Sequence, residues 1–287
     1  MKDISIALLG AGYTLERTAA MLPRDHVVLT ARSRERVLAL RAAGYLAEEL
    51  DISDAEKTRH FFSQYKNIET VVDSVPPAAG TANGPLHVVQ ALQERALPIR
   101  RVIYLSTTGV YGVDDGTSVD ETRRLNPLHA RAQLRVDAEA VYQASGFPCC
   151  CFRIAAIYGP GRGPGLSLKA GRYPYVEGGA RWSNRIHVTD LARAIQAAIS
   201  SNHELPPAVN LSDDQPALTR DVIEFYCAKF SLPFPQSISL QNARERGLDT
   251  LLSNQRVSNS LLKRTFSLEL SYPSYKEGAG SEFVLPE

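Results

Sequence analysis

The sequence predicts an α/β fold built on a doubly wound parallel sheet. Apolar strand-like runs alternate with helical patterns of about 10–15 residues, as in parallel strands joined by right-handed crossovers. A glycine turn joins the first strand to the first helix, which is also typical of such sheets. With 287 residues and 44% hydrophobic content, the chain is long enough for a large core and a smaller lobe.

Hydrophobic periodicity predicts the individual elements. Strands are expected at residues 4–9, 26–30, 70–73, 101–106 and 149–154, and helices at 14–21, 34–43, 55–65, 85–96 and 130–145. The glycine-rich residues 159–165 exclude regular structure, and residues 171–184 are also loop-like. Regular structure is predicted again at 185–200, 208–211, 219–230 (with Thr219 as N-cap) and 255–258, before a short helix from Asn259.

The first turn carries the most specific chemical signal. The first strand runs into Gly10, Ala11, Gly12, Tyr13 and Thr14, where glycines let backbone amides approach a pyrophosphate at a helix N-terminus. The third glycine position of G-x-G-x-x-G is occupied by leucine, so helix and strand approach less closely there. Two glycines also serve any tight turn of this kind. We interpret Gly10, Gly12, Tyr13 and Thr14 as dinucleotide contacts.

The end of the second strand selects the cofactor. An NAD site usually offers a carboxylate about 20 residues after the glycines, but no acid lies between His26 and Arg34. Arg32 and Arg34, with the Ser33 hydroxyl, suit a 2′-phosphate because guanidinium binds phosphate in a fixed fork. The alternative is a solvated helix start that includes Arg36. The sequence therefore predicts NADP, with NAD less favoured.

Charge and cysteine usage restrict the class of protein. With a net charge of +1, the chain has no overall electrostatic attraction to nucleic acid or to a membrane surface. No apolar stretch approaches the length of a membrane span, and the N-terminus lacks the layout of a signal peptide. Residues 149–151 are consecutive cysteines in a strand pattern, so their side chains alternate in direction and cannot converge on a metal. We expect a cytoplasmic protein without a metal, a membrane or a nucleic-acid partner.

Four segments resemble the extended short-chain dehydrogenases/reductases, the nucleotide-sugar epimerase group. Residues 105–112 resemble S-[ST]-x-x-V-Y-G, residues 153–161 resemble R-x-x-x-x-Y-G-P-G, residues 185–192 resemble I-H-V-x-D-x-A, and residues 210–214 resemble the strand end that follows. With the N-terminal unit, the resemblance covers most of residues 4–260. It implies a Rossmann-like core over residues 1–158 and a small mixed lobe over 159–287, with residues 185–212 returning to the core.

The resemblance also implies further cofactor contacts. By family position, Asp51 and Ile52 frame the adenine. Val75 and Pro76 lie where the chain runs past the central phosphates and ribose of the cofactor. Pro76 has no amide hydrogen to donate, so it contributes packing alone. Family members often dimerise through two core helices, which leaves a homodimer open.

The family's catalytic pair, a tyrosine with a lysine four residues later, is not reproduced. If Glu139 matches the family's glutamate late in this helix, the two positions hold Arg131 and Arg135; an offset of two gives His129 and Gln133. Arginine stays protonated, so Arg131 cannot exchange a proton but can bind an anion or stabilise an oxyanion. Arg135 takes the position that holds the ribose. The chain thus resembles atypical members of the superfamily.

Other side chains are candidates for the chemistry. Thr107 matches the serine or threonine that orients the reacting oxygen, and Tyr111, Tyr158 and His187 are candidates for charge stabilisation or proton transfer. Three of them have a structural alternative: a hydrogen-bonded strand end for Thr107, packing beneath the loop for Tyr111, and a hydrogen-bonded helix start for His187.

The leading hypothesis is an NADP(H)-binding oxidoreductase acting on a small polar substrate. Four arginines lie in the irregular segment after Tyr158: Arg162, Arg172, Arg181 and Arg185. As a mobile, positively charged lid they would suit a phosphorylated or carboxylated substrate; the alternative is a set of exposed loop arginines. One rival is a non-catalytic NADP(H) sensor or scaffold, supported by the missing tyrosine-lysine pair. A second is a nucleotide-sugar epimerase or dehydratase, which normally needs that tyrosine.

Overall fold

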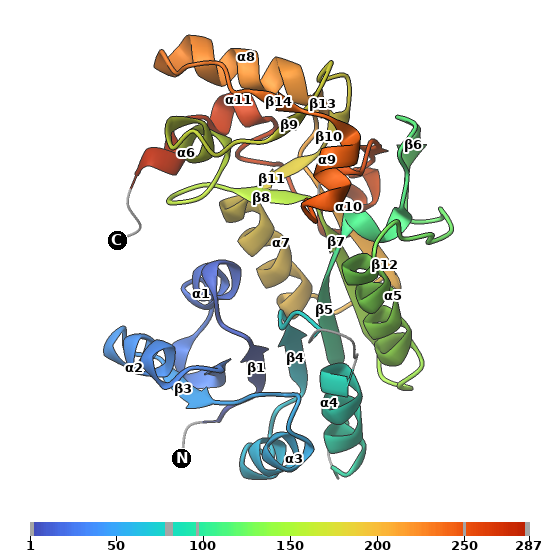
Figure 1. Cartoon of the computed structure of the whole chain (residues 1–287). Helices are drawn as coiled ribbons and strands as arrows, with labels where there is room; N and C mark the ends of the chain where they lie inside the picture. The colour runs from blue at the N-terminus through green and yellow to red at the C-terminus, as the bar shows by residue number, and fades with distance from the viewer. Residues whose placement is uncertain (1–2, 78–82, 96–97, 249–250, 285–287) are drawn as a thin grey trace. The chain divides into compact units, whose positions relative to one another are not determined.

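The computed structural model describes residues 3–77, 83–95, 98–248 and 251–284 (Figure 1). The chain divides into two compact units, and it passes between them several times. Unit 1 comprises residues 1–107, 130–153 and 192–209, and unit 2 comprises residues 108–129, 154–191 and 210–287.

Unit 1 is built on a seven-stranded sheet in the order β12-β7-β5-β4-β1-β2-β3. The strands are β1 (Ile6–Leu9), β2 (Val27–Ala31), β3 (Leu46–Glu49), β4 (Thr70–Asp73), β5 (Arg101–Thr107), β7 (Cys149–Ile154) and β12 (Ala208–Leu211), whose end enters unit 2. Strands β3, β2, β1, β4 and β5 pair in parallel. The predicted doubly wound parallel sheet is confirmed, and its order reverses between β1 and β4, where such sheets bind ligands.

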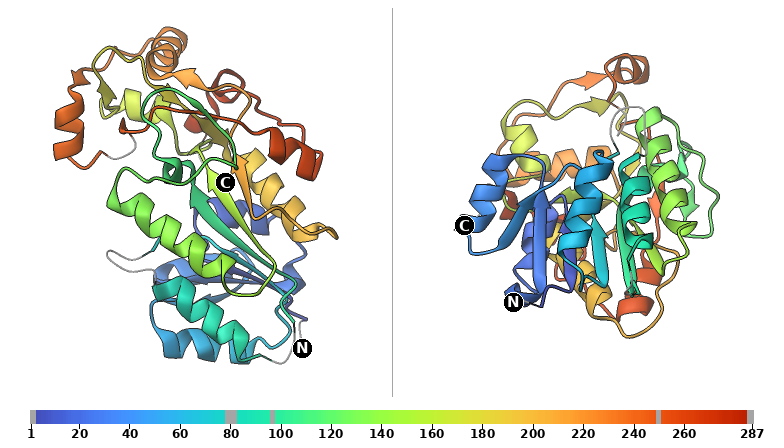
Figure 2. Two further views of the ribbon diagram at one scale, coloured as in Figure 1. Left: turned by 90° about the vertical axis from the view of Figure 1, so that its right-hand side faces the viewer. Right: turned by 90° about the horizontal axis from the view of Figure 1, so that it is seen from below.

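Helices follow the strands as the periodicity predicts (Figure 2). They are α1 (Tyr13–Ala19), α2 (Arg34–Ala42), α3 (Ala55–Gln64), α4 (Asn83–Gln93), α5 (Ala130–Gln143) and α7 (Val188–Ser200), which begins in unit 2. Helix α4 contacts both α3 and α5. Phe61, Phe62 and Leu92 from these helices pack with Val71 and Val102 of the sheet in one apolar core. Burying each such side chain stabilises the fold by about 1.5–3 kcal/mol.

One strand of this sheet is missing from the sequence prediction. Strand β3 lies at the edge of the sheet and pairs with β2 alone among the described strands. Its sequence Leu-Ala-Glu-Glu has only Ala47 fully buried, so it lacks the continuous apolar run of a central strand.

Unit 2 is a mixed assembly of short elements. Its helices are α6 (Pro164–Lys169), α8 (Thr219–Phe230), α9 (Leu240–Glu245), α10 (Ser260–Phe266) and α11 (Tyr275–Gly278). Its strand pairs are β8 (Ala156–Tyr158) with β11 (Arg185–His187), β9 (Tyr175–Val176) with β14 (Ser237–Ile238), β10 (Trp182–Ser183) with β13 (Ala217–Leu218), and β6 (Ser118–Val119) with β15 (Arg256–Val257).

Three local predictions in unit 2 are wrong. Helix α6 begins inside the glycine-rich segment, because Pro164 suits a first helical position. The segment 171–184 contains β9 and β10, two-residue strands held by distant partners. Thr219 is the first helical residue of α8 rather than its N-cap, and its hydroxyl donates to the carbonyl of Arg181 at 3.0 Å.

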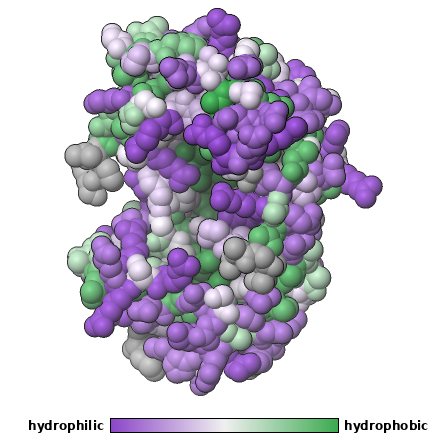
Figure 3. Space-filling view, in the orientation of Figure 1, coloured by the Kyte–Doolittle hydropathy of each residue, from purple (hydrophilic) through white to green (hydrophobic). Residues whose placement is uncertain are grey.

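Polar side chains cover most of the face drawn in Figure 3, with apolar ones dispersed among them. Among the described residues, none of the helices has both the length and the apolar composition needed to cross a membrane.

Candidate functional site

The glycine turn lies where the order of the sheet reverses, at the carboxyl end of β1. Gly10 has φ +74°, and a Cβ there would lie 2.8 Å from Cγ2 of Val75 on the segment after β4. Gly12 has φ −107°, and among the described atoms a Cβ there would meet nothing nearer than the Gly10 carbonyl oxygen at 3.9 Å. Gly10 is therefore required by the backbone, whereas Gly12 leaves open space in front of α1. A pyrophosphate fits such a cradle at a helix N-terminus.

The turn is fixed by bonds from the neighbouring strand and helix. The Gly10 amide donates to Oγ1 of Thr30 at 3.2 Å, and the Ala11 amide donates to the Thr30 carbonyl at 2.6 Å. Arg36 donates from Nε to the Ala11 carbonyl at 3.2 Å and pairs with Glu16 at 2.5 Å. The interpretation of Arg36 as a solvated cation is therefore wrong. Leu15 is fully buried in the position of the third glycine.

The basic segment after β2 keeps two exposed guanidinium groups. Ser33 caps α2, because its hydroxyl accepts a hydrogen bond from the Arg36 amide at 3.3 Å. Arg32 and Arg34 flank it, and both are exposed. The segment thus presents two guanidinium groups, a hydroxyl and the N-terminus of α2, all of which favour a phosphate.

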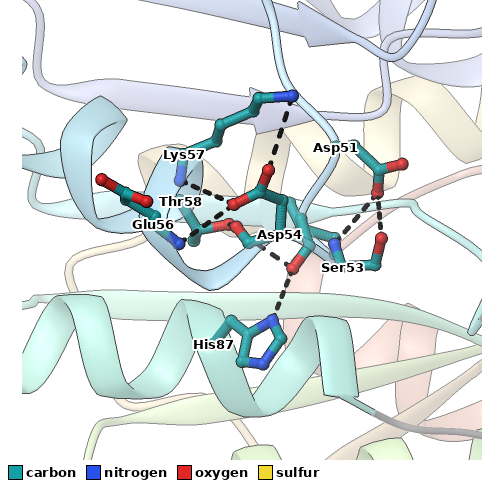
Figure 4. Close-up of polar contacts among 8 residues, drawn as sticks. Asp51, Ser53, Asp54, Glu56, Lys57, Thr58 and His87 are labelled. Atoms are coloured by element: carbon teal, nitrogen blue, oxygen red, sulfur yellow. Dashed lines mark hydrogen bonds and ion pairs between the residues drawn. The ribbon is translucent and has the colours of Figure 1, made fainter.

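The segment after β3 is held in a defined turn (Figure 4). Asp51 accepts hydrogen bonds from the amide and hydroxyl of Ser53 at 3.0 and 2.7 Å, and these bonds lower the pKa of its carboxyl. The Ile52 carbonyl lies 3.0 Å from Nδ1 of His87 on α4, and a Cβ on Gly84 would lie 2.9 Å from the Ile52 side chain. Asp51 and Ile52 are therefore placed by α4 as well as by their own turn.

Helix α5 carries Arg131 in its first turn and places Arg135 near the end of β5. Arg135 is half-buried, and its Nη1 donates to the Leu105 carbonyl at 2.8 Å and to the Tyr104 hydroxyl at 3.1 Å. Arg131 is exposed in the first turn of the helix. Thr107 is half-buried as the last residue of β5, two positions beyond the carbonyl that Arg135 contacts. Unit 1 thus brings Arg135 close to the strand end that carries Thr107.

The three aromatic candidates, Tyr111, Tyr158 and His187, are buried and hydrogen-bonded within unit 2. The Tyr111 hydroxyl donates to Oδ1 of Asn210 at 2.6 Å, and the Tyr158 hydroxyl donates to the Ser274 carbonyl at 3.0 Å. Burial is the main cause that raises the pKa of Tyr158. The placement of Tyr111 favours packing beneath the loop, and the hydroxyl of Tyr158 is likewise hydrogen-bonded within unit 2.

His187 is 1% exposed and bonded through both ring nitrogens. Its Nδ1 accepts from the Thr189 amide at 3.2 Å, so we assign the proton to Nε2, which lies 3.1 Å from Oγ of Ser281. The ring also stacks on Tyr272 with 3.7 Å between centroids. This arrangement is that of a histidine serving the structure.

The glycine-rich segment contacts residue 282 of the same unit. The Gly161 amide donates to the Glu282 carbonyl at 3.0 Å. At Gly163 (φ +150°) a Cβ would collide with the Glu282 carboxylate, and at Gly165 a Cβ would lie 2.7 Å from it. Tyr226 of α8 donates its hydroxyl to the same carboxylate at 2.9 Å. We call residues 271–283, which carry Glu282, the C-terminal strap.

The predicted set of lid arginines is not a uniform exposed surface. Arg181 donates to the Leu252 carbonyl at 2.5 Å, and Arg185 is buried and donates to the Ser183 hydroxyl at 3.0 Å. Arg162 and Arg172 are exposed. The prediction of a lid is therefore wrong for Arg181 and Arg185, because internal acceptors take their guanidinium groups.

The strap should loosen as the pH rises. Burial raises the pKa of Glu282 from its ordinary value of 4.5 to about 7, against the hydrogen bond from Tyr226. Because the pKa of Glu282 is higher in the folded state than in the unfolded state, neutral Glu282 stabilises the fold. This contribution to the free energy of unfolding is complete below pH 4.5 and is lost as the pH rises through about 7.

Hydrogen exchange across the strap, corrected for intrinsic rates, measures this effect. We expect protection to fall between pH 5 and 7.5, and Glu282→Gln to remove that fall. Glu277→Gln is the matched control in the same segment, because a hydrogen bond from Ser274 lowers the pKa of Glu277. Equal pH dependence in all three proteins would contradict the prediction.

Comparison with known proteins assigns the family. The model of the NAD dependent epimerase/dehydratase family matches residues 10–212, from the glycine turn to the end of β12. This chain belongs to that family. The resemblance to extended short-chain dehydrogenases/reductases is confirmed.

Individual known proteins are distant from this chain in sequence, and two solved structures resemble its fold. A 3-diazoavenalumate denitrifying reductase from Streptomyces is 25% identical over 293 residues, covering 93% of this chain and 90% of that protein. A functionally unknown conserved protein from Silicibacter pomeroyi is 30% identical, with a TM-score of 0.77 and 96% of both chains covered. The structure of MoeE5 in complex with UDP-glucuronic acid and NAD is 17% identical, with a TM-score of 0.76 over 97% of both chains.

Proposed function

We propose that this chain is an NADP(H)-binding oxidoreductase of the atypical short-chain type that acts on a small polar or anionic substrate. The observation that carries the proposal is the carboxyl edge of β1 and β2. There the open space at Gly12 adjoins a helix N-terminus, and two exposed arginines follow the next strand. The Streptomyces relative is named as a reductase, which supports an oxidoreductase, and the MoeE5 structure is described as holding NAD, which supports a nicotinamide dinucleotide as the ligand.

The residues present fit a dinucleotide, which we place on the Rossmann-like core of residues 1–158, with residues 159–287 as the substrate lobe. The Gly10–Thr14 turn would hold the pyrophosphate, Arg32, Ser33 and Arg34 the 2′-phosphate, and Asp51 and Ile52 the adenine. Val75, Pro76 and Arg135 would bound the central phosphates and ribose. When bound, the cofactor supplies the hydride.

The chain's own groups orient the substrate and stabilise its charge. Thr107 would orient the reacting oxygen through its hydroxyl, and Arg131 would stabilise negative charge as a permanent cation. We assign no proton transfer to Tyr111, Tyr158 or His187, because hydrogen bonds within unit 2 hold their polar atoms.

Calorimetric titration with NADPH and NADH tests the site. Charge-assisted hydrogen bonds contribute about 1.5–3 kcal/mol each, so Arg32→Ala/Arg34→Ala should weaken NADPH binding at least about tenfold while sparing NADH. Arg220→Ala is the control, since Arg220 is an exposed arginine of α8 paired with Glu224. Absence of binding by either nucleotide would overturn the proposal, and preference for NADH would remove NADP from it.

A second candidate is a non-catalytic NADP(H) sensor, favoured by arginines at the positions of the tyrosine-lysine pair. Both functions predict NADPH binding, so a screen of carbonyl compounds for NADPH consumption separates them. Consumption that is lost in Thr107→Val would support the oxidoreductase.

A further inference from the structure

A buried carboxylate lies beside the glycine turn, on the strand that pairs with β1. Asp73 is the last residue of β4 and has no exposed surface. Its Oδ2 accepts a hydrogen bond from the Tyr142 hydroxyl of α5 at 2.6 Å, and its Oδ1 accepts one from the Val75 amide at 2.8 Å. Asp73 therefore joins a core helix to the segment that follows its own strand.

That segment bounds the glycine turn. A Cβ on Gly10 would lie 2.8 Å from Cγ2 and 3.3 Å from the amide nitrogen of Val75. The amide that Asp73 holds is thus the one that faces Gly10. A shift of Val75 by a few tenths of an ångström would alter the space in which we place the pyrophosphate.

The ionisable groups facing Asp73 come from two elements. Helix α5 contributes Tyr142 and Arg135, and β5 contributes Tyr104, whose ring lies 5.2 Å from that of Tyr142 between centroids. The Tyr104 hydroxyl accepts a hydrogen bond from Arg135 at 3.1 Å. The negative charge of Asp73 therefore acts on the same group of side chains that holds the guanidinium of Arg135 at the end of β5.

An ionisable group in this place is costly to the fold. A buried carboxylate loses its hydration, and two hydrogen bonds offset only part of that loss. Burial raises the pKa of Asp73 to about 6, against the bonds from Tyr142 and Val75 and the charge of Arg135. Asp73 therefore changes charge close to neutral pH beside a site for an anion.

We propose that Asp73 is a positioning residue for the nucleotide, which holds Val75 against Gly10 and weakens nucleotide binding when it becomes charged. The inference rests on the proposed function. Protein with neutral Asp73 would bind the anionic dinucleotide more tightly than protein with ionised Asp73. The ionised carboxylate would repel the phosphates, and the buried surroundings of Asp73 screen that repulsion less than water does.

Binding of NADP⁺ between pH 5.5 and 8 tests the inference in wild type and Asp73→Asn. The 2′-phosphate itself titrates near pH 6, so the ratio of the two Kd values, rather than either alone, isolates Asp73. We expect wild-type and variant Kd values to agree near pH 5.5, and the wild-type Kd to exceed the variant's by about fivefold at pH 8. Asp120→Asn is the matched control, because hydrogen bonds from Thr122 keep the pKa of that exposed carboxylate low.

A second variant keeps the test independent of the stability of Asp73→Asn. Tyr142→Phe removes a donor to the ionised carboxylate, so the pH dependence of binding should shift to higher pH. If Tyr142 has only a structural role, Tyr142→Phe would change the affinity for the nucleotide without changing the midpoint of its pH dependence. A constant Kd ratio and an unmoved midpoint would overturn the inference. Wild-type protein that binds no nucleotide would instead overturn the proposed function, and this inference with it.

Discussion

Replacing Glu139 by alanine is expected to lower the free energy of unfolding by about 3–5 kcal/mol. Glu139 is 1% exposed, and its carboxylate lies 2.8 Å from Nη2 of Arg153, which is 5% exposed. Ser106 of β5 donates its hydroxyl to the same carboxylate at 2.5 Å. The variant leaves a buried guanidinium without its carboxylate and a buried hydroxyl without its acceptor, and both losses destabilise unit 1.

Urea denaturation followed by far-ultraviolet circular dichroism measures the change. The matched control is Glu224→Ala, because Glu224 pairs with Arg220 at a similar 2.7 Å but both side chains are more than half exposed. We expect the control to change the free energy of unfolding by about 0.5 kcal/mol or less. Equal effects at the two positions would show that burial does not set the strength of the Glu139 pair.

The sequence predicts the central sheet well because its strands have a strong local signal. Strands β4, β7 and β12 and helix α8 have the predicted bounds. Each of these strands is mostly apolar and almost wholly buried, and this pattern is visible in the hydrophobicity of the sequence. Edge strand β3 and the two-residue strands of unit 2 lack such a run, because pairing with distant segments creates them.

The residues of the candidate site also fall into those that a local sequence pattern predicts and those that only the fold brings together. The glycine turn and the basic segment after β2 are local patterns, so their residues can be named from the sequence. The contacts of Arg36 with Ala11, of Tyr142 with Asp73 and of Glu282 with the glycine-rich segment join residues far apart in the chain. Sequence patterns do not carry such pairings, so the roles of Asp73 and Glu282 emerge only from the fold.

Alanine at Gly10 should lower the stability of the fold, whereas alanine at Gly12 should lower nucleotide binding and leave the stability nearly unchanged. Gly10→Ala places a side chain at φ +74° and 2.8 Å from Val75, so strain and overpacking should lower the free energy of unfolding by about 2–4 kcal/mol. Gly12→Ala meets neither obstacle, because its φ is −107° and the space before it is open. Its free energy of unfolding should change by less than about 1 kcal/mol.

Nucleotide binding then separates the two roles. The methyl group of Gly12→Ala would occupy the space proposed for the pyrophosphate, so NADPH affinity should fall at least about tenfold in a fully folded protein. Thermal denaturation and calorimetric titration of the same sample give both quantities. If Gly12→Ala binds NADPH as tightly as wild type, the pyrophosphate does not lie in the open space at Gly12. A stable Gly10→Ala protein would show instead that the segment carrying Val75 moves aside without cost.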